Sequence, residues 1–371
     1  MSLAQYDLST KVNYLNRQMF LDPAGQVTIQ RFEEVAYPKI ARFAEIAEGF
    51  FWRPQEVNLQ KDKIDMKEAS EAVKFIFTEN LLRQTSLDSL QGRGVAQIFT
   101  PVISVPELED LVTNWSFFET SIHSKSYSHI IRGIYNMPKD EFNRIHENEA
   151  ITKMAANVGK YYHHLHLLNC QKEATPEWFA ENVGEEAHLR AVWLALNASY
   201  ALEAIRFMVS FATSLAMVEN KIFIGNGNII SLILQDELLH TDWTAYLINQ
   251  VVKDDPRFAK LRKECAEEVY AMYMDVIREE KEWAIHLFKK GTVIGLNAQI
   301  LSDFVDYIAK QRLEAIGIKY TEPAPKSTPI PWFGKHQNTS KKQTALQENE
   351  STSYVIGAVT EDIDFDQLPS L

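Results

Sequence analysis

The sequence contains very few cysteines, which excludes several kinds of site. Cys170 and Cys265 are the two cysteines among 371 residues. Two isolated cysteines exclude a disulfide framework, and their separation excludes a CxxC zinc or redox site. Such sparse cysteine usage is typical of proteins in a reducing compartment, so we expect a cytoplasmic location.

Glycine and proline are also scarce. The chain has 14 glycines and 13 prolines, together about 7% of its residues, against an average of roughly 12%. Few residues of these types mean few turns. The composition therefore argues against an all-β sandwich or propeller and favours long helices.

Positive charge and long apolar runs are lacking as well. The 38 Lys and Arg residues are outnumbered by 50 Asp and Glu residues, giving a formal net charge of −12. This balance excludes non-specific nucleic-acid binding and a polybasic membrane attachment. The longest strongly apolar stretch, 207–218, is shorter than the ~20 residues that a membrane span needs. The N-terminus has no apolar segment typical of a secretory signal. From the charge balance and the lack of long apolar runs, we expect neither nucleic acid nor membrane as a partner.

Helical periodicity extends through most of the chain, with apolar residues recurring at three- and four-residue spacing. We predict an all-α fold, with an N-terminal extension over 1–35 and a helical domain over 36–320. The predicted helices are 38–51, 69–92, 105–135, 139–169, 175–199, 201–219, 227–252, 255–289 and 297–315.

Residues 321–371 differ in composition and predict a flexible tail. They begin with several prolines, continue polar, and end in the acidic and apolar sequence EDIDFDQLPSL. Such a segment buries too little apolar surface to order itself. Composition alone leaves two interpretations open, a tail without a role and a docking peptide that becomes ordered on a partner.

Two of the predicted helices are apolar almost all round and still carry acids. The helix over 201–219 contains Glu203, and the helix over 227–252 contains Asp236, Glu237 and His240. A buried carboxylate is costly unless it is protonated, paired or bound to a metal. These acids therefore require an explanation beyond packing.

A pattern of metal-ligand types follows from the spacing. Glu237 and His240 are three residues apart and share a helix face, which by itself more often means a surface pair or a satisfied core histidine. Glu119 and His123 form a second pair with a spacing of four, while Glu203 and Asp88 stand singly on two further helices. Two helices with a carboxylate and a histidine, and two with one carboxylate each, form the ligand set of a di-iron or di-manganese carboxylate bundle.

Several stretches carry a family resemblance, and they occur in the expected order: FFWRP (50–54), LDSLQGR (87–93), VPELED (105–110), HSKSYSHIIRGI (123–134), ALEAIRF (201–207), QDELLH (235–240), TPIPW (328–332) and STSYVIG (351–357). The sequence resembles the small, radical-generating beta subunit of class I ribonucleotide reductase, of the bacterial and phage class Ia type. The resemblance implies a ferritin-like bundle with extra helices that works as a homodimer, in the host cytoplasm if a phage encodes it.

The resemblance also implies the cofactor and its ligands. Each chain would bind two iron ions, oxo-bridged when oxidised, after reaction with O2 and an external electron donor. One ion would be held by Asp88, Glu119 and His123, and the other by Glu203, Glu237 and His240. Tyr127 would carry a stable tyrosyl radical, inside an apolar pocket formed by Phe207, Phe211 and Ile233.

A radical-transfer route is implied in the same way. Asp236 would link His123 to Trp52, and Tyr354 in the tail would pass the oxidising equivalent to the large catalytic subunit. Glu56 matches a further residue associated with this communication. The acidic and apolar C-terminus would be the peptide that docks on the large subunit, which reduces ribonucleoside diphosphates.

The chain departs from the family at one ligand pair. The spacing is normally Glu-x-x-His, but one extra residue separates Glu119 from His123. An inserted residue in a helix is usually absorbed as a π-bulge, so we expect a bulge at 120–122 that returns both side chains to the metal. The extra residue leaves manganese open as the alternative metal. A stand-alone di-iron oxidase and a ferritin-like store also explain the ligands, but neither explains Tyr127, Asp236 and Tyr354 together.

Overall fold

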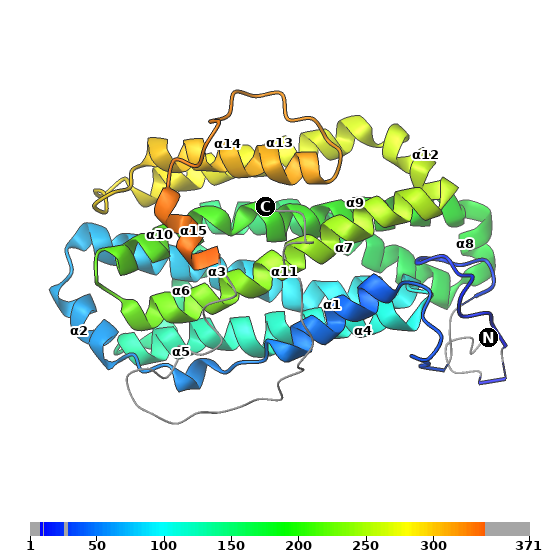
Figure 1. Cartoon of the computed structure of the whole chain (residues 1–371), viewed down its shortest axis with the longest axis horizontal. Helices are drawn as coiled ribbons and strands as arrows, with labels where there is room; N and C mark the ends of the chain where they lie inside the picture. Colours follow the sequence, from blue (N-terminus) through cyan, green and yellow to red (C-terminus); the bar gives the residue numbers. More distant parts are fainter. Residues whose placement is uncertain (1–7, 10, 26–28, 338–371) are drawn as a thin grey trace.

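The computed structural model describes residues 8, 9, 11–25 and 29–337. Figure 1 shows an elongated bundle in which most long helices run roughly along the long axis of the molecule. Within these ranges no β-strand forms, and the strand-like pairings are two isolated bridges, Phe20 with Ile103 and Val293 with Leu296. The prediction of an all-α fold is confirmed for this part of the chain.

The helices that surround the predicted ligands lie at the centre of the bundle. They are α3 (Glu71–Phe99), α4 (Pro106–Phe117), the π-helical segment η4 (Phe118–His123), α5 (Ser124–Ile134), α9 (Gly184–Ala201), the π-helical segment η5 (Leu202–Arg206), α10 (Met208–Glu219) and α11 (Ile224–Asp254).

Further helices cover this centre or join its parts. They are α1 (Pro38–Gly49), the short 3₁₀ turn η2 (Pro54–Glu56), α2 (Gln60–Glu68), η3 (Thr100–Val102), α6 (Pro138–Glu147), α7 (Glu149–Ala174), α8 (Pro176–Asn182), α12 (Pro256–Glu264), α13 (Ala266–Leu287), α14 (Ala298–Ala315), η6 (Pro331–Phe333) and α15 (Gly334–Gln337).

Side-chain caps explain where several helices begin. The Ser70 hydroxyl accepts a hydrogen bond from the Val73 amide at the start of α3, and Asn148 caps α7 in the same way. The first amides of α11 are capped from another helix, because the Asp62 carboxylate accepts hydrogen bonds from Gly225 and Asn226. Each cap satisfies amides that have no partner inside their own helix.

The predicted helix boundaries need correction in several places, and one is that the helix predicted over 69–92 continues through Gly92 and Gly94 to Phe99. The helix predicted over 139–169 is interrupted, since Asn148 leaves the helical conformation and starts α7. The helices predicted over 175–199 and 255–289 are likewise broken, at Val183 and at Cys265. The helix α2 was missed, because most of its residues are charged or polar and the side chain that it buries is the polar Asp62.

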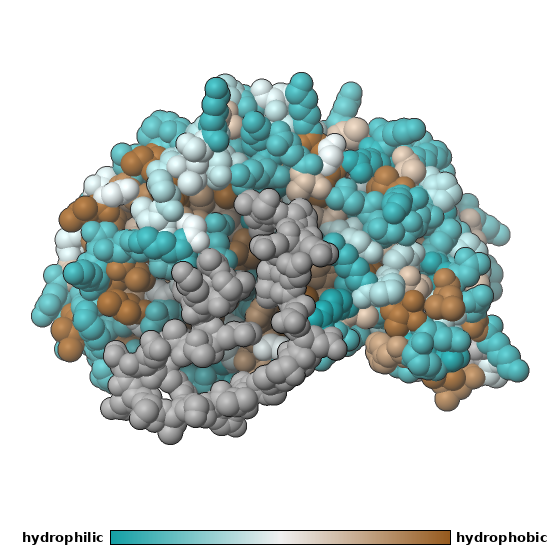
Figure 2. Space-filling view, in the orientation of Figure 1, coloured by the Kyte–Doolittle hydropathy of each residue, from teal (hydrophilic) through white to brown (hydrophobic). Residues whose placement is uncertain are grey.

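The continuous run through α9, η5 and α10 is the most deeply buried part of the bundle. Residues Gly184–Glu219 are long and apolar enough to cross a membrane, but 94% of the most apolar window is buried inside the protein. This agrees with the prediction that the helix over 201–219 is apolar almost all round. Figure 2 shows that the face drawn is mainly hydrophilic, with apolar side chains in small scattered groups.

The packed part of the chain extends beyond residue 320, where the sequence predicted the flexible tail to begin. Ile330 and Phe333 are buried, and Phe333 packs edge-on against Phe304 of α14 with ring centroids 5.1 Å apart. The short helix α15 then lies against α11, as Figure 1 shows. The apolar side chains of this stretch explain its packing, because their removal from water is favourable. The polar residues before them gain no such stabilisation. The rest of the predicted tail lies outside the described residues.

Candidate metal centre

Six buried side chains of types that can bind a metal meet at the centre of the bundle. α3 supplies Asp88, η4 supplies Glu119 and His123, η5 supplies Glu203, and α11 supplies Glu237 and His240. All six are at most 1% exposed. The bundle thus brings together every metal ligand that the sequence predicted.

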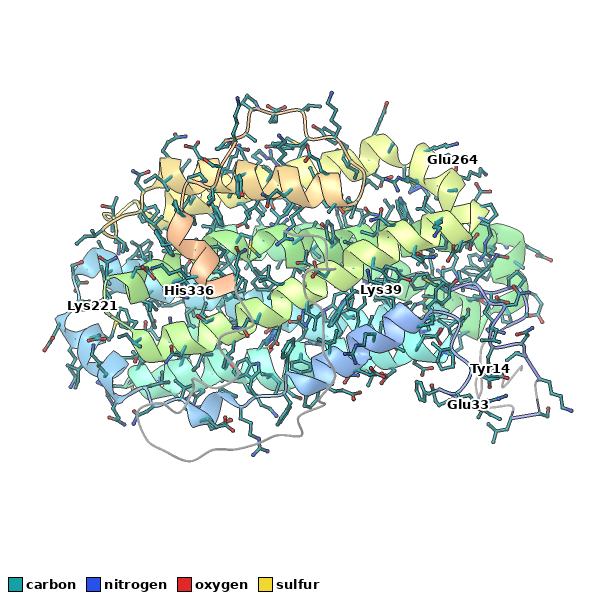
Figure 3. All side chains as sticks on the ribbon, in the orientation of Figure 1. Tyr14, Glu33, Lys39, Lys221, Glu264 and His336 are labelled. Carbon is teal, nitrogen blue, oxygen red and sulfur yellow. The ribbon has the colours of Figure 1, made fainter. Side chains whose placement is uncertain are left out.

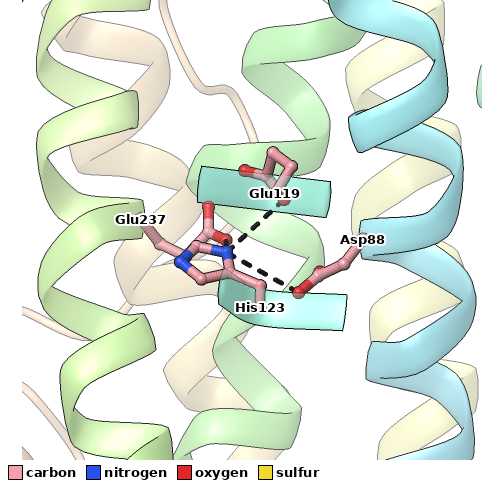
Figure 4. Close-up of side chains that lie close together, drawn as sticks. All are labelled: Asp88, Glu119, His123 and Glu237. Carbon is pink, nitrogen blue, oxygen red and sulfur yellow. Dashed lines mark ion pairs between the residues drawn. The ribbon is translucent and has the colours of Figure 1, made fainter. Parts of the chain in front are cut away.

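The six residues form two overlapping groups. In one group, ligand atoms of Asp88, Glu119, His123 and Glu237 lie within 4.8 Å of one another; in the other, those of Glu119, Glu203, Glu237 and His240 do. Figure 4 shows the first group, with the four side chains converging between α3, η4 and α11. Because Glu119 and Glu237 belong to both groups, they can bridge a pair of ions.

The extra residue between Glu119 and His123 is absorbed as expected. The segment that contains it is a π-helix, and the Ser124 amide donates to the Glu119 carbonyl five residues earlier. This wider turn brings His123 Nδ1 to 3.5 Å from Glu119 Oε2. The prediction of a π-bulge is confirmed. The second π-helical segment, which contains Glu203, was not predicted.

Both imidazoles turn Nδ1 into the cluster. His123 Nδ1 lies 3.3 Å from Glu237 Oε1 and 3.7 Å from Asp88 Oδ2. His240 Nδ1 lies 2.9 Å from Glu119 Oε1 and 3.5 Å from Glu237 Oε2. Nδ1 is therefore the nitrogen that each histidine can offer to a metal.

A carboxylate outside the cluster sets the tautomer of one of these histidines. Asp236 Oδ2 lies 3.0 Å from His123 Nε2 and accepts a hydrogen bond of 2.8 Å from the Trp52 indole. An Nε2–H that donates to Asp236 leaves Nδ1 free for a metal, which is the usual arrangement around metal-binding histidines. The predicted link from His123 through Asp236 to Trp52 exists in the structure.

The electrostatics of the cluster are those of a site that needs a cation. Burial, and then the charge of Glu119, raises the pKa of Asp88 well above its usual value. Burial and the neighbouring Glu203 do the same to the pKa of Glu237. Among the described residues, the carboxylate oxygens of Asp88, Glu119 and Glu237 find no hydrogen-bond partner of normal geometry. Buried carboxylates without partners fit ligation of divalent ions.

Protons can supply part of the positive charge that the buried carboxylates require when they do not bind a metal. Burial by itself would lower the pKa of His123, but the surrounding carboxylates, Glu119 first, raise it well above its usual value. The pKa of His240 is raised by its carboxylate neighbours in the same way. Burial opposes the ionisation of Glu119, but His123 lowers the pKa of this carboxyl to about 2.

Binding of a divalent ion is therefore expected to release protons and to strengthen as the pH rises. The metal requires neutral imidazoles and ionised carboxylates, whereas His123, His240, Asp88 and Glu237 all hold protons to a higher pH than usual. Because unperturbed histidine titrates near about 6.5, affinity should still increase above that pH. Calorimetry of Mn²⁺ binding in buffers with different ionisation enthalpies measures the release directly. Heats that do not depend on the buffer would contradict this expectation.

The predicted radical residue lies beside the cluster. Tyr127 is fully buried one helical turn after His123, and burial followed by the charge of Asp88 raises the pKa of its phenol well above the usual value. Phe207, Phe211 and Ile233 are fully buried as well, and the first two rings stack with centroids 5.4 Å apart. Their role as a pocket around the tyrosine stays a prediction.

One further predicted residue lies at the surface, and another cannot be placed. Glu56 is exposed at the end of η2. Tyr354 lies outside the described residues. Their roles stay predictions.

The sequence analysis missed two side chains that hold a ligand in place. Trp115 Nε1 donates a 2.8 Å hydrogen bond to Glu203 Oε1, and the Gln91 amide donates to the same oxygen. Glu203 Oε2 is thereby left as the oxygen that faces His240, at 3.6 Å from Nδ1. Helical spacing could have found both, since Gln91 follows Asp88 by three residues and Trp115 precedes Glu119 by four.

Comparison with known proteins gives consistent matches along the chain. The family model "Ribonucleotide reductase, small chain" matches residues 30–324. The chain is 39% identical to ribonucleoside-diphosphate reductase 1 subunit beta of Salmonella typhimurium, covering 97% of this chain and 96% of that protein. It is 34% identical to ribonucleoside-diphosphate reductase subunit beta of Enterobacteria phage T4, covering 95% of both chains.

Solved structures agree on the fold. The ribonucleotide reductase R2 subunit from Clostridium botulinum superposes with a TM-score of 0.71 at 20% identity, covering 86% of this chain and 94% of that one. The dimanganese(II) NrdF of Streptococcus sanguinis gives a TM-score of 0.68 at 20% identity, covering 84% of this chain and 100% of that one.

Proposed function

The chain belongs to the ribonucleotide reductase small-chain family, and from this premise we propose that it holds two iron ions and carries a stable radical on Tyr127. When bound, an iron pair supplies the reduction of dioxygen, which is the reaction that oxidises the tyrosine. The observation that carries the proposal is the cluster of six buried ligands, with two shared carboxylates, directly beside a buried tyrosine. As a subunit of ribonucleoside-diphosphate reductase, the chain acts together with the large subunit.

The protein residues divide into two ligand sets and two bridges. Asp88 and His123 would hold one ion, and Glu203 and His240 would hold the other. Glu119 and Glu237, which belong to both groups, would be shared between the two ions. Gln91 and Trp115 fix one oxygen of Glu203, so this carboxylate offers the metal its other oxygen.

The surroundings of Tyr127 suit a neutral radical. Oxidation of a phenol removes an electron and a proton, and among the carboxyl groups around Tyr127 it is Asp88 whose charge acts most strongly on the phenol. Full burial keeps water and reductants away from the ring. These features support Tyr127 as the radical site in preference to a tyrosine that only fills the core.

The route out of the cluster runs through His123, Asp236 and Trp52, which are joined by hydrogen bonds. We propose that the oxidising equivalent leaves by this route and passes through Tyr354 to the large subunit, with Glu56 assisting that contact. The C-terminal residues would dock on the large subunit. We also propose that the small subunit is a homodimer and acts in the cytoplasm.

The test is an anaerobic ferrous titration followed by oxygen and electron paramagnetic resonance. We expect two irons per chain and a tyrosyl signal in the wild type, and two irons without that signal in Tyr127→Phe. Tyr200→Phe is the matched control, because Tyr200 is equally buried but donates to the Arg312 carbonyl, away from the ligands. Two irons without any radical in the wild type would leave a di-iron protein and favour a stand-alone oxidase.

Manganese is the alternative metal. The extra residue between Glu119 and His123 changes the helix at a carboxylate shared by both ligand groups, and one structural neighbour is the dimanganese(II) NrdF of Streptococcus sanguinis. The same titration with Mn²⁺, followed by an assay with the large subunit, separates the two metals. Activity that needs manganese and is absent with iron would replace the iron proposal.

A further inference from the structure

A chain of hydrogen bonds leads from Glu203 away from the cluster. The Gln91 amide nitrogen donates to Glu203 Oε1, and Gln91 Oε1 accepts a hydrogen bond from the Tyr162 hydroxyl. That hydroxyl lies 2.7 Å from Ser199 Oγ. All four side chains are buried, and Figure 3 shows that side chains fill the spaces between the helices of the bundle. The chain of bonds therefore joins α7, which supplies none of the six candidate ligands, to the cluster.

The protons available to this chain of bonds fix its direction. Gln91 Oε1 carries no proton, so the Tyr162 hydroxyl must donate to it. Because Tyr162 has no second proton, Ser199 must be the donor between the two hydroxyls. A Gln91 amide turned the other way would set its carbonyl oxygen against the Glu203 carboxylate. The bonds consequently run from Ser199 through Tyr162 and Gln91 to Glu203, and successive bonds of this kind strengthen one another in a medium of low dielectric constant.

The position of the Tyr162 ring depends on a glycine of α3. Gly94 lies in the interior of that helix, where glycine is less favourable than alanine. A Cβ at Gly94 would stand 2.3 Å from Tyr162 Cδ2 and 2.6 Å from Tyr162 Cε2, so the ring occupies space that a larger residue would fill. Burial raises the pKa of the Tyr162 phenol, and the hydroxyl held at this place therefore keeps its proton as a donor.

The Gln91 amide needs such a contact because its terminal torsion is soft. A side-chain amide rotates about its last bond between two broad positions. With Tyr162 bound to its oxygen, the amide keeps its nitrogen aimed at Glu203 Oε1, which also accepts from Trp115. Two donors on Oε1 leave Glu203 Oε2, at 3.6 Å from His240 Nδ1, as the oxygen available to a metal.

We propose that Tyr162 is a positioning residue of the metal centre: its hydroxyl fixes the Gln91 amide, and the amide restricts Glu203 to binding a metal through Oε2. The inference rests on the proposed function in one respect, namely that Glu203 is a metal ligand. Tyr162 acts through Gln91 and not on the metal, and this distinguishes its role from that of a ligand.

The first test is calorimetric titration of the full-length chain with Mn²⁺. Tyr162→Phe removes the hydroxyl but keeps the ring beside Gly94, and Ser199 still has an acceptor in the Ala195 carbonyl, 3.0 Å away. We expect the affinity for Mn²⁺ to fall about tenfold, the lower end of the effect of losing a ligand's support. Tyr161→Phe is the matched control, since it removes the hydroxyl of the preceding residue on α7, which is not part of this chain of bonds. It should bind Mn²⁺ like the wild type.

Infrared difference spectra between the Mn²⁺-loaded and the metal-free protein report how the carboxylates bind. A carboxylate that binds through one oxygen has its two stretching bands further apart than a carboxylate that binds through both. Weaker restraint of Glu203 Oε1 in Tyr162→Phe should therefore bring one pair of bands closer together, whereas a mere loss of stability would leave the bands in place. Bands identical to those of the wild type would overturn the proposal.

A double variant shows whether Tyr162 acts through Gln91. Gln91→Leu removes both amide contacts and should itself weaken Mn²⁺ binding, and adding Tyr162→Phe to it should cause no further loss. Losses that add, or wild-type affinity in Tyr162→Phe alone, would overturn the positioning role. A wild type that binds fewer than two Mn²⁺ per chain would instead overturn the metal pair of the proposed function, so the two failures are distinguishable.

Discussion

Replacing Gly92 with alanine is expected to weaken metal binding by about 100-fold, the upper end of the effect of misplacing a ligand's support. Gly92 lies on α3 against the π-helical segment. A Cβ there would stand 2.5 Å from Thr120 Oγ1, 3.0 Å from the Thr120 backbone nitrogen and 3.2 Å from Glu119 Cβ. The added methyl must push the π-turn away, and with it the bridging Glu119.

The direction of this effect is informative because alanine normally favours a helix. Glycine to alanine in a helix interior stabilises by up to about 1 kcal/mol where space allows. Gly159→Ala is the matched control, since its Cβ would meet only Leu90 Cδ1, at an ordinary 3.7 Å. It should bind Mn²⁺ like the wild type.

A second variant separates the clash with the Thr120 hydroxyl from the other two contacts of an added Cβ at Gly92. Adding Thr120→Ala to Gly92→Ala removes the closest clash but leaves the backbone nitrogen and Glu119 Cβ. Metal affinity, measured by calorimetry, should recover only in part. Wild-type affinity in Gly92→Ala alone would mean that the π-turn does not position Glu119.

Replacing Trp52 with phenylalanine is expected to preserve formation of the Tyr127 radical but to slow reductase turnover. The variant loses the indole N–H that donates to Asp236 at 2.8 Å, while all six metal ligands stay in place. The Tyr127 radical should therefore form, and reductase turnover with the large subunit should fall by about 100-fold or more. Electron paramagnetic resonance and a coupled turnover assay on the same sample measure the two quantities.

The control for this experiment is a buried tryptophan elsewhere in the bundle. Trp193 is 3% exposed and packs against Phe258, on the α9 and α12 side of the molecule. Trp193→Phe should keep both the radical and turnover. If Trp52→Phe turns over at the wild-type rate, the oxidising equivalent leaves the cluster by another route.

The sequence alone was sufficient for the fold class and for the types of ligand. Long helical periodicity with few turn residues predicts an all-α bundle, and acids on helices that are apolar all round demand a partner for their charge. Glu237 and His240 share a face because helical geometry places residues three apart one turn along. The extra residue before His123 also predicted the π-bulge, because a helix usually absorbs an inserted residue in this way.

The cap on α11 and the role of Gly92 could not be predicted from the sequence, because both depend on neighbours remote in the chain. Asp62 caps α11 at Gly225, 163 residues further along, so no local pattern marks it. The π-helical segment packs so closely on α3 that position 92 has no room for a Cβ. This requirement exists only in the packed structure.

The chemistry of the cluster also depends partly on local sequence and partly on tertiary packing. Local spacing determined which residues can bind metal. Tertiary packing decided that Glu119 and Glu237 are shared, that Trp115 and Gln91 hold one oxygen of Glu203, and that Trp243 stacks on His240. The reason is physical: ligand types follow from side chains on one helix, whereas shared oxygens, tautomers and ring contacts exist only between helices.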